Sequence, residues 1–509
     1  MKVSEVVKDI QLMAAKGALS GEVSSICYHS GSCEENSLFV AVSGLSTDGH
    51  DFIDDAIRHG ARWIVHERPF PCPDHVTSLR VADSRRALGL AGRNFYAYPS
   101  SQLCLIGITG TNGKTTVTYL LESIIAAAGF QPGVLGTINY RYAGQILPAP
   151  NTTPESLEFQ KILRLMADGG VTHCVSEISS HALALGRVDD CDFDLGVFTN
   201  LSQDHLDYHR TMERYFDAKS RLFRELLPRS NKRRSRCMVI NGDDPWGRRL
   251  IEENPEDVLT FGLDGPRDIR SEDMRTSLQG IEGYLRIPGK TLQITSTLIG
   301  RFNIYNIMAA AGAAYAIGID AAAIELGIAS IQGIPGRMEK VSRAGEPHVF
   351  VDYAHTDDAL RKAIENLSGY LKGRLITVFG CGGDRDQGKR PLMGFVAATL
   401  GDTVIVTSDN PRSEDPHAII RQIEEGIRRK DIRKVAPADL PPTGSDKVYA
   451  IIPDRRTAIE TAVRTAKVDD IVLIAGKGHE DYQIVGHECL HFDDRIVARE
   501  SLVQRNGGA

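Results

Sequence analysis

The chain has 509 residues, of which 42% are hydrophobic and 25% charged, and this balance is typical of a folded globular protein. At ~150 residues per domain, the length allows about three domains. Its 66 acidic and 59 basic residues give a net charge of −7, which argues against binding a nucleic-acid backbone as the main role. Nine scattered cysteines without a Cys-x-x-Cys pair indicate reduced thiols, and neither a signal segment nor a membrane-spanning run is visible. We therefore expect a cytoplasmic, monomeric protein that binds neither nucleic acid nor membrane.

Short apolar runs alternate with glycine- or aspartate-containing loops and amphipathic runs. This alternation predicts an α/β fold with mainly parallel strands. The strands are expected at 38–42, 62–66, 103–109, 172–177, 195–199, 238–240, 375–379, 403–407 and 471–475, and helices at 52–59, 117–128 and 305–317. Turn signals near residue 100 and at Gly333–Gly336 predict three domains, 1–100, 101–335 and 336–509. The central one is expected to be a phosphate-loop domain and the last one a Rossmann-like α/β domain.

A glycine-rich loop, Gly110–Thr116, follows the predicted strand Leu103–Thr109 and precedes a helical run. A strand, a glycine loop, a lysine and a helix in this order typically wrap backbone N–H groups around nucleotide phosphates. The residues expected to bind the nucleotide are Gly110, Thr111, Asn112, Gly113, Lys114, Thr115 and Thr116. The common spacing has a glycine where this chain has Ile108, so the alternative is a plain turn between strand and helix.

Acidic and histidine side chains follow the next predicted strands. Glu177 ends the run 172–177, at the strand end where parallel sheets bind ligands. The segment Thr199–His209 contains Asp204, His205, Asp207 and His209. A Mg²⁺ site that includes one histidine is favoured over zinc, because no cysteine stands at zinc-like spacing, and the alternative is a merely polar loop.

Several motifs, in this order along the chain, resemble those of the Mur ligase family. They are 109–116, Glu177-x-Ser-Ser-His181, 200–209, Asn303-x-x-Asn306, Gly336–Glu339 and Asp352–His355. Members of this family join an amino acid to a UDP-linked carboxylate, using ATP to form an acyl phosphate first. The resemblance therefore implies ATP as co-substrate, Mg²⁺ as cofactor, and small-molecule substrates as the partners.

The resemblance also implies roles for individual residues. The catalytic set would be Lys114, Lys219, His205 and Glu177, and the metal ligands Thr115, Glu177 and His205. Lys219, which otherwise reads as an ordinary helix lysine, matches a position that the family carries as a carbamylated lysine (N6-carboxylysine). Further ATP contacts would come from Asn303, Arg337 and Asp352. The UDP-linked substrate would meet Ser30 with the nearby loop Leu45-Ser46-Thr47, and Asn151, Thr152, Thr153, Ser179, Leu185 and Arg187.

Three loops that follow predicted parallel strands concern the incoming amino acid. They cover 380–390, 408–416 and 475–482, and should line one crevice. The first has Arg385 where a dinucleotide fingerprint needs its last glycine, so NAD binding is not expected. Arg412 suits a carboxylate and Glu480 an ammonium group, and a substrate end with both charges fits meso-diaminopimelate better than L-lysine. The expected contacts are Arg390, Asp409, Asn410, Pro411, Arg412, Gly476 and Glu480.

Three alternatives stay open from the sequence. The first is the same ligase with L-lysine as its substrate. The second is another ligase of the superfamily, a folylpolyglutamate synthetase or the enzyme that adds D-Ala-D-Ala, although Asp409–Arg412 and the N-terminal section argue against both. The third is a phosphate-loop nucleotide switch without ligation.

Overall fold

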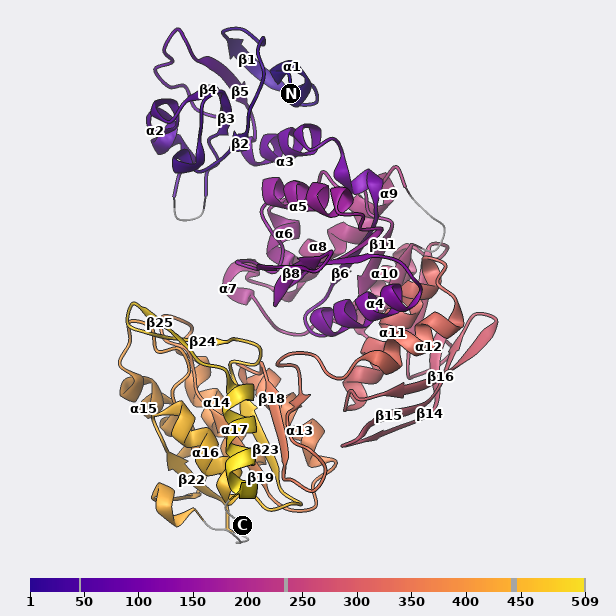
Figure 1. The fold of residues 1–509 in the computed structure, drawn as a ribbon, viewed down its shortest axis with the longest axis vertical. Coiled ribbons are helices and arrows are strands. Elements are labelled where there is room, and N and C mark those ends of the chain that lie inside the picture. The colour runs from indigo at the N-terminus through magenta and orange to yellow at the C-terminus, as the bar shows by residue number, and fades with distance from the viewer. Residues whose placement is uncertain (45–46, 233–236, 441–445, 508–509) are drawn as a thin grey trace. The chain divides into compact units, whose positions relative to one another are not determined.

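The structure, a computed structural model, describes residues 1–44, 47–232, 237–440 and 446–507 (Figure 1). Leu45 and Ser46, expected near the UDP-linked substrate, lie outside the described residues. The chain divides into two compact units. The first comprises 1–274, 283–294 and 304–330, and the second 275–282, 295–303 and 331–509.

A five-stranded sheet, in the order β1-β5-β4-β3-β2, forms the N-terminal part of the first unit. Its strands are β1 (Leu12–Lys16), β2 (Ile26–Cys27), β3 (Ser37–Val40), β4 (Ala61–His66) and β5 (Thr77–Val81). Its helices are α1 (Val3–Val6), α2 (Ile53–Arg58) and α3 (Ser84–Phe95). The Asp83 carboxylate accepts the N–H of Arg86 and so begins α3, which packs Leu88 and Ala91 into the core against Trp63.

The next sheet has eleven strands, in the order β16-β15-β14-β13-β12-β11-β6-β10-β7-β8-β9. The central strands β12, β11, β6, β10 and β7 pair in parallel, and the hairpin strands β8 and β9 continue antiparallel from β7. These strands are β6 (Cys104–Thr109), β7 (Pro132–Leu135), β8 (Asn139–Tyr142), β9 (Gln145–Pro148), β10 (His173–Glu177), β11 (Leu195–Phe198), β12 (Met238–Asn241), β13 (Val258–Gly262), β14 (Ile269–Ser277), β15 (Gly280–Ile287) and β16 (Lys290–Ser296).

Several helices of this stretch come directly after a parallel strand, as expected for crossover connections. The helices are α4 (Lys114–Ala127), α5 (Ser156–Asp168), α6 (Ser180–Ala184), α7 (Leu206–His209), α8 (Met212–Arg221), α9 (Leu227–Arg229), α10 (Pro245–Glu253), α11 (Arg301–Ala316) and α12 (Ala321–Ser330). Helix α5 instead follows the hairpin β8–β9, and α11 and α12 follow β16. Because β6 and β10 are neighbours, the loops that follow them, at Gly110 and Ile178, meet at one edge of the sheet.

A seven-stranded sheet, in the order β17-β18-β23-β19-β20-β22-β21, forms the core of the second unit. Alternate residues of β19 enter two separate cores, since Leu375 packs with α13–α15 and Ile376 with α16 and α17. Its strands are β17 (Glu339–Lys340), β18 (His348–Asp352), β19 (Leu375–Phe379), β20 (Thr403–Val406), β21 (Arg433–Lys434), β22 (Val448–Ile451) and β23 (Ile471–Ala475). Its helices are α13 (Asp357–Ser368), α14 (Lys389–Leu400), α15 (Pro416–Ile427), α16 (Arg455–Thr465) and α17 (Asp494–Gly507), and a separate hairpin joins β24 (Tyr482–Val485) to β25 (Glu488–His491).

The predicted α/β fold is confirmed, and every predicted strand is present within a residue or two of its expected bounds. The sequence interpretation named nine strands and left the others unassigned. Some of these, such as β8 and β16, alternate between exposed and buried residues and lack a continuous apolar run, whereas β18 (His348–Asp352) and β22 (Val448–Ile451) are mostly buried and were missed all the same. Each large sheet lies inside one of the three predicted domain ranges, whose boundaries stay a prediction. Across the described residues, no helix combines the length and apolar composition needed to cross a bilayer.

Candidate functional site

The glycine loop joins the end of β6 to the start of α4. Gly113, the residue before α4, has φ +88°, a conformation that favours glycine. A Cβ at Gly113 would lie 2.3 Å from Oδ1 of Asn306 in α11, so a larger residue would also collide there. The first turn of an α-helix points backbone N–H groups away from the helix, so the start of α4 is a typical position for an anion.

The segment that follows β11 holds this loop in place. The Asn112 N–H donates to Oδ1 of Asn200 at 3.0 Å, and the Thr199 hydroxyl donates to the carbonyl of Asn112 at 2.6 Å. The Thr111 N–H donates to the backbone oxygen of Asn200 at 2.8 Å. Three hydrogen bonds therefore join two motifs that are separate in the sequence.

Two lysine side chains converge on the start of the loop. Nζ of Lys114 and Nζ of Lys219 each donate to the backbone oxygen of Gly110, both at 2.9 Å. Lys219 comes from α8, is 1% exposed, and lies 4.8 Å from the ring centre of Tyr215. Burial, and to a smaller extent the charge of Lys114, lowers the pKa of Lys219 well below its usual value. The environment therefore favours a neutral amine at Lys219.

Glu177, the last residue of β10, is 1% exposed and lies beside the loop. Its Oε2 accepts the hydroxyl groups of Thr115 at 3.1 Å and of Thr137 at 2.9 Å, and Oε1 accepts the N–H of Thr137 at 3.0 Å. A buried carboxylate beside a threonine hydroxyl is a donor set that suits Mg²⁺, which takes few protein ligands. Thr115 and Glu177 thus fit the cation that the sequence predicts.

His205 lies in the neighbouring loop, at φ +53°, and its side chain is 46% exposed. Its ring contacts His181 edge-to-face at a centroid distance of 4.9 Å and lies 6.2 Å from the ring of Tyr215. Within the described ranges, no three His, Cys, Asp or Glu side chains are close enough to hold a metal together. The assignment of His205 as a third ligand beside Thr115 and Glu177 stays a prediction.

A cavity of about 490 Å³ lies in the N-terminal part of the first unit. Ser30 lines it together with Tyr28, Arg85 of α3, and Glu155, the residue that caps α5. The Glu155 carboxylate pairs with Arg85 at 2.5 Å and with Arg187 at 3.4 Å. One wall of the cavity is therefore in ionic contact with a residue expected to bind the UDP-linked substrate.

The remaining residues expected for that substrate gather next to Glu177. The Thr153 hydroxyl donates to the backbone oxygen of Glu177 at 2.8 Å and accepts the N–H of Ser179 at 3.0 Å. Thr152 contacts Thr137, which itself bonds Glu177, at 3.1 Å between hydroxyl oxygens. The other members complete the group: Arg187 donates to the carbonyl of Thr153 at 3.2 Å, the Asn151 carbonyl accepts the hydroxyl of Tyr140, and Leu185 is half-buried at the end of α6.

In the second unit, Asp352 ends β18, and its carboxylate accepts the N–H groups of Met338 and Ala354 at 2.7 and 2.9 Å. Arg337 lies over the ring of Tyr353 at 4.7 Å. Burial, opposed by the nearby Arg337 guanidinium, raises the pKa of the Asp352 carboxyl. Asn303, near the start of α11, is buried, and its amide donates to the backbone oxygen of Ile299 at 2.8 Å.

The loop after β20 is held by a buried lysine that the sequence analysis missed. Nζ of Lys477 donates to Oδ1 of Asn410 and to Oε2 of Glu480, both at 3.1 Å, and the Asn410 amide donates to Glu480 at 2.8 Å. Lys477 is fully buried and directly follows Gly476. Burial raises the pKa of the Glu480 carboxyl, and the charge of Asp409 adds to this. A lysine between two strand-end loops carries no sequence signal of its own, so only the fold reveals it.

Arg412 and Arg390 differ in their surroundings. Arg412 is partly exposed, with φ +50°, and its Nη1 donates to the carbonyl of Gly383 at 2.8 Å. Arg390 is fully buried, and its guanidinium binds both carboxylate oxygens of Glu414 at 2.8 Å and Oε1 of Gln422 at 2.7 Å. The carboxylate that Arg390 holds in this structure is thus an internal one, whereas Arg385 on the same loop is exposed.

Comparison with known proteins gives three family models that match along the chain. The Mur ligase family catalytic domain matches residues 22–96, the Mur ligase middle domain 108–314, and the Mur ligase glutamate ligase domain 336–478. A Geobacter metallireducens protein named UDP-N-acetylmuramoyl-L-alanyl-D-glutamate–2,6-diaminopimelate ligase is 47% identical over 97% of both chains. Proteins of the same name from Geobacter sulfurreducens and Caldanaerobacter subterraneus are 44% identical over all of both chains and 41% identical over 99% of both.

Solved structures agree with these relatives. The solved structure of a UDP-N-acetylmuramoyl-L-alanyl-D-glutamate–2,6-diaminopimelate ligase is 32% identical, covers 99% of both chains and has a TM-score of 0.69. The MurF ligase of Thermotoga maritima, solved in complex with ADP, is 20% identical over 94% of this chain and 96% of its own, with a TM-score of 0.59. This second likeness concerns the fold alone.

Proposed function

The chain belongs to the Mur ligase family, and on this premise we propose that it adds meso-diaminopimelate to UDP-N-acetylmuramoyl-L-alanyl-D-glutamate at the expense of ATP. One observation carries the proposal: the glycine loop and the segment expected to bind the substrate meet at Glu177. Its side chain accepts the hydroxyl of Thr115 from the loop, and its backbone oxygen accepts that of Thr153 from the substrate segment. A γ-phosphate and a substrate carboxylate bound to these two elements would be neighbours, as phosphoryl transfer between them requires.

The reaction then has two steps. A carboxylate oxygen of the substrate attacks the γ-phosphorus, the bond to ADP breaks, and an acyl phosphate forms. The amine of the incoming amino acid attacks the acyl carbon, phosphate leaves, and the nitrogen loses a proton. Lys114 and the N–H groups at the start of α4 would stabilise the negative charge on the phosphate oxygens. Thr111, Asn112 and Thr116 complete the loop that binds them.

A divalent cation would be held by Thr115 and Glu177, with His205 as the further ligand expected from the family. When bound, Mg²⁺ would neutralise charge on the phosphate oxygens. The burial of the Glu177 carboxylate and its contact with the Thr115 hydroxyl support this assignment.

Lys219 is proposed to act as its carbamate. The neutral amine that burial favours can attack CO₂, forming a C–N bond and releasing one proton, and the lysine then carries a negative charge. This change would turn a buried neutral amine beside Lys114 into an anionic partner for it. The depressed pKa of Lys219 and its position near Gly110 support this modification.

Specificity for the amino acid is assigned to the loops of the seven-stranded sheet. Arg412 would bind the distal carboxylate of diaminopimelate, and Glu480, fixed by Asn410, its ammonium group. L-lysine lacks that carboxylate and would leave Arg412 without an anionic partner. Arg390 is proposed to act indirectly, by holding Glu414 and the loop that precedes α14.

The rest of the ATP molecule is assigned to Asn303, Arg337 and Asp352. Asn303 would face the adenine, while Asp352 lies at the carboxyl end of β18 and binds the N–H of Met338, the residue after Arg337. The substrates are small molecules, and we place the reaction in the cytoplasm with a monomeric enzyme.

The test is mass spectrometry of the product made from UDP-N-acetylmuramoyl-dipeptide, ATP, and equal concentrations of meso-diaminopimelate and L-lysine. The expected product is the diaminopimelate tripeptide, with one ADP and one phosphate per amide bond. A tripeptide that contains L-lysine would show that the enzyme prefers L-lysine and would contradict the proposed specificity. Phosphate release that needs neither the UDP-dipeptide nor an amino acid would instead favour a nucleotide switch.

A further inference from the structure

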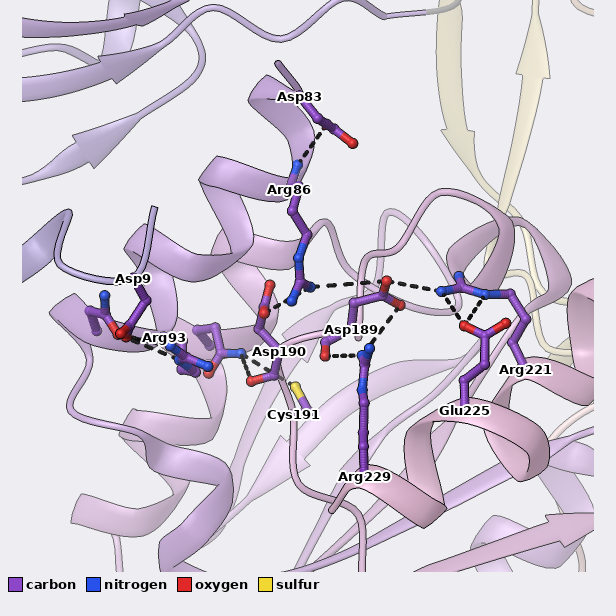
Figure 2. A network of polar contacts seen from close by, with 12 residues as sticks. Asp9, Asp83, Arg86, Arg93, Asp189, Asp190, Cys191, Arg221, Glu225 and Arg229 are labelled. Carbon is purple, nitrogen blue, oxygen red and sulfur yellow. Dashed lines mark hydrogen bonds and ion pairs between the residues drawn. The ribbon is translucent and has the colours of Figure 1, made fainter. Parts of the chain in front are cut away.

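Two adjacent carboxylates, Asp189 and Asp190, lie two and three residues after Arg187, in the loop that ends the expected substrate segment (Figure 2). Their side chains are 12% and 2% exposed. Neither residue belongs to the expected substrate contacts, yet arginines from three different helical segments surround them. Ion pairs of two neighbouring, largely buried carboxylates with several arginines indicate a structural role in addition to any effect on solubility.

Asp190 attaches the loop to α3. Its Oδ1 lies 2.8 Å from Nη1 of Arg86, in an ion pair that lacks hydrogen-bond geometry. The carboxylate also packs against Gly89 of α3, where a Cβ would lie 2.3 Å from Oδ2. The backbone oxygen of Asp190 accepts the amide of Gln160 from α5 at 3.1 Å. The loop therefore packs closely against α3 at Gly89, where a residue larger than glycine would collide with Asp190.

Asp189 attaches the same loop to α8. Its Oδ2 accepts Nη2 of Arg221 at 3.0 Å, and Arg221 also donates to the carbonyl of Leu183 in α6. Arg221 stands two residues after Lys219 on α8. Arg229 donates to the backbone oxygen of Asp189 from the other side. The loop thus has a fixed position relative to the helix that brings Lys219 to the glycine loop.

Helix α3 also contacts the cavity that contains Ser30. Its residues Arg85 and Leu88 line the cavity that contains Ser30, while Arg86 and Gly89 hold Asp190. One helix therefore joins the cavity wall to the Arg187 loop, and that loop is joined through Arg221 to α8.

We propose that Asp189 and Asp190 are positioning residues that hold the two ends of the UDP-linked substrate in register. This rests on the proposed function, in which the cavity takes the UDP end and the segment from Thr153 to Arg187 takes the dipeptide end. The two carboxylates fix the distance between these regions, so that a nucleotide bound in the cavity directs its peptide carboxylate to Glu177. They contact neither substrate nor ATP.

The experiment compares the binding of UDP alone with that of the UDP-N-acetylmuramoyl-dipeptide, by calorimetry, in the full chain. The variants are Asp190→Asn, Asp189→Asn and Arg221→Gln, with Arg221→Lys as the conservative change. Asp470→Asn is the control, because the Asp470 side chain is also buried, at 4% exposed, and also pairs with an arginine, Arg374, in the other unit. The KM for ATP is measured alongside, and thermal unfolding reports whether each variant is folded.

In the three disrupting variants, we expect the ratio of the Kd for UDP to the Kd for UDP-N-acetylmuramoyl-dipeptide to fall about tenfold, with the KM for ATP unchanged. Arg221→Lys should recover part of it, and Asp189→Asn with Arg221→Gln should together lose no more than either alone. Equal weakening of both ligands, or no change, would overturn the proposal, and so would the same loss in Asp470→Asn. Failure of the proposed function would appear differently, as a parent protein that makes no amide product.

Discussion

The side-chain nitrogen of Lys219 donates a hydrogen bond to the backbone oxygen of Gly110, 109 residues earlier in the chain. Helix α8 thereby places a buried amine at the first residue of the glycine loop. Burial lowers the pKa of this amine and favours its neutral form, whereas a lysine on the surface keeps its positive charge.

Lys219→Arg should lower kcat by about 100-fold or more, because arginine keeps the positive charge but cannot form the carbamate. ADP release in the presence of all three substrates measures the effect, and the intact mass of the parent protein detects the added carboxyl group. The control is Lys161→Arg on the exposed side of α5. A Lys219→Arg variant with parental kcat would exclude carbamylation as a requirement.

Glu177→Gln should lower kcat by about 100-fold and raise the Mg²⁺ concentration needed for half-maximal activity. The amide keeps the size of the side chain and can still bond Thr137, but it removes the negative charge. Glu122→Gln, which alters a partly exposed ion pair with Arg141, serves as the control. If the Mg²⁺ dependence stays parental, Glu177 is not a metal ligand.

Gly113→Ala should raise the KM for ATP and lower the melting temperature, because the added Cβ meets Oδ1 of Asn306 at 2.3 Å. Positive φ alone costs about 1 kcal/mol for a non-glycine residue. Gly129→Ala separates the two effects, since Gly129 has φ +81° and open space around its Cβ position. We expect Gly129→Ala to lower stability slightly and leave the KM for ATP unchanged; equal KM values for ATP in both variants would contradict the prediction.

Arg412→Ala should weaken the binding of diaminopimelate by about 2–5 kcal/mol, which is the cost of removing one partner from a charged pair. The ratio of kcat/KM for diaminopimelate to that for L-lysine should fall with it, because lysine never uses this contact. Arg433→Ala, at an exposed position of β21, is the control. An unchanged ratio would remove Arg412 from the specificity site.

Asp190 should make stability depend on pH. Burial raises the pKa of its carboxyl from 3.8 to about 6, against the opposing charges of Arg86 and Arg93. The folded state then keeps a proton that the unfolded state loses above pH ~4, so the stability contributed by this proton is complete below the unfolded pKa. It is lost as the pH rises through about 6, and amounts to at most ~3 kcal/mol.

Asp190→Asn should remove that dependence, since the amide does not ionise. Urea unfolding of the parent and variant at pH 4.5, 5.5 and 7.5 measures it. The free energy of unfolding of the variant minus that of the parent should become more positive as the pH rises. Parallel curves at all three values would show that Asp190 does not titrate in this range.

Much of the nucleotide site could be predicted from the sequence because its signal is local. The strand, the glycines and Lys114 are consecutive, and the structure gives them the expected strand–loop–helix geometry. Lys219 has no such signal, since its importance comes from a contact with Gly110 that only the tertiary fold creates. Without the family resemblance, it reads as a surface residue.

The loops of the second unit were harder to interpret. The guanidinium of Arg390 reads as a substrate ligand in the sequence, but the fold gives it the carboxylate of Glu414. Lys477 shows no pattern, yet it bonds both Asn410 and Glu480. Pairings between segments tens of residues apart depend on the strand order of the sheet, which no local pattern specifies.

The main chain of Arg412 pairs with the hairpin β24–β25, through its N–H to the carbonyl of Ile484 at 3.0 Å and its carbonyl to the N–H of Gly486 at 2.8 Å. This hairpin is a two-stranded ribbon apart from the large sheets, and most of its side chains are exposed or half-exposed. A change in the length or the turn of this hairpin would reorient Arg412 without altering any residue that is expected to bind phosphate. Evolution could therefore change which amino acid is added by remodelling a surface ribbon, while the residues proposed to activate the substrate carboxylate stayed the same.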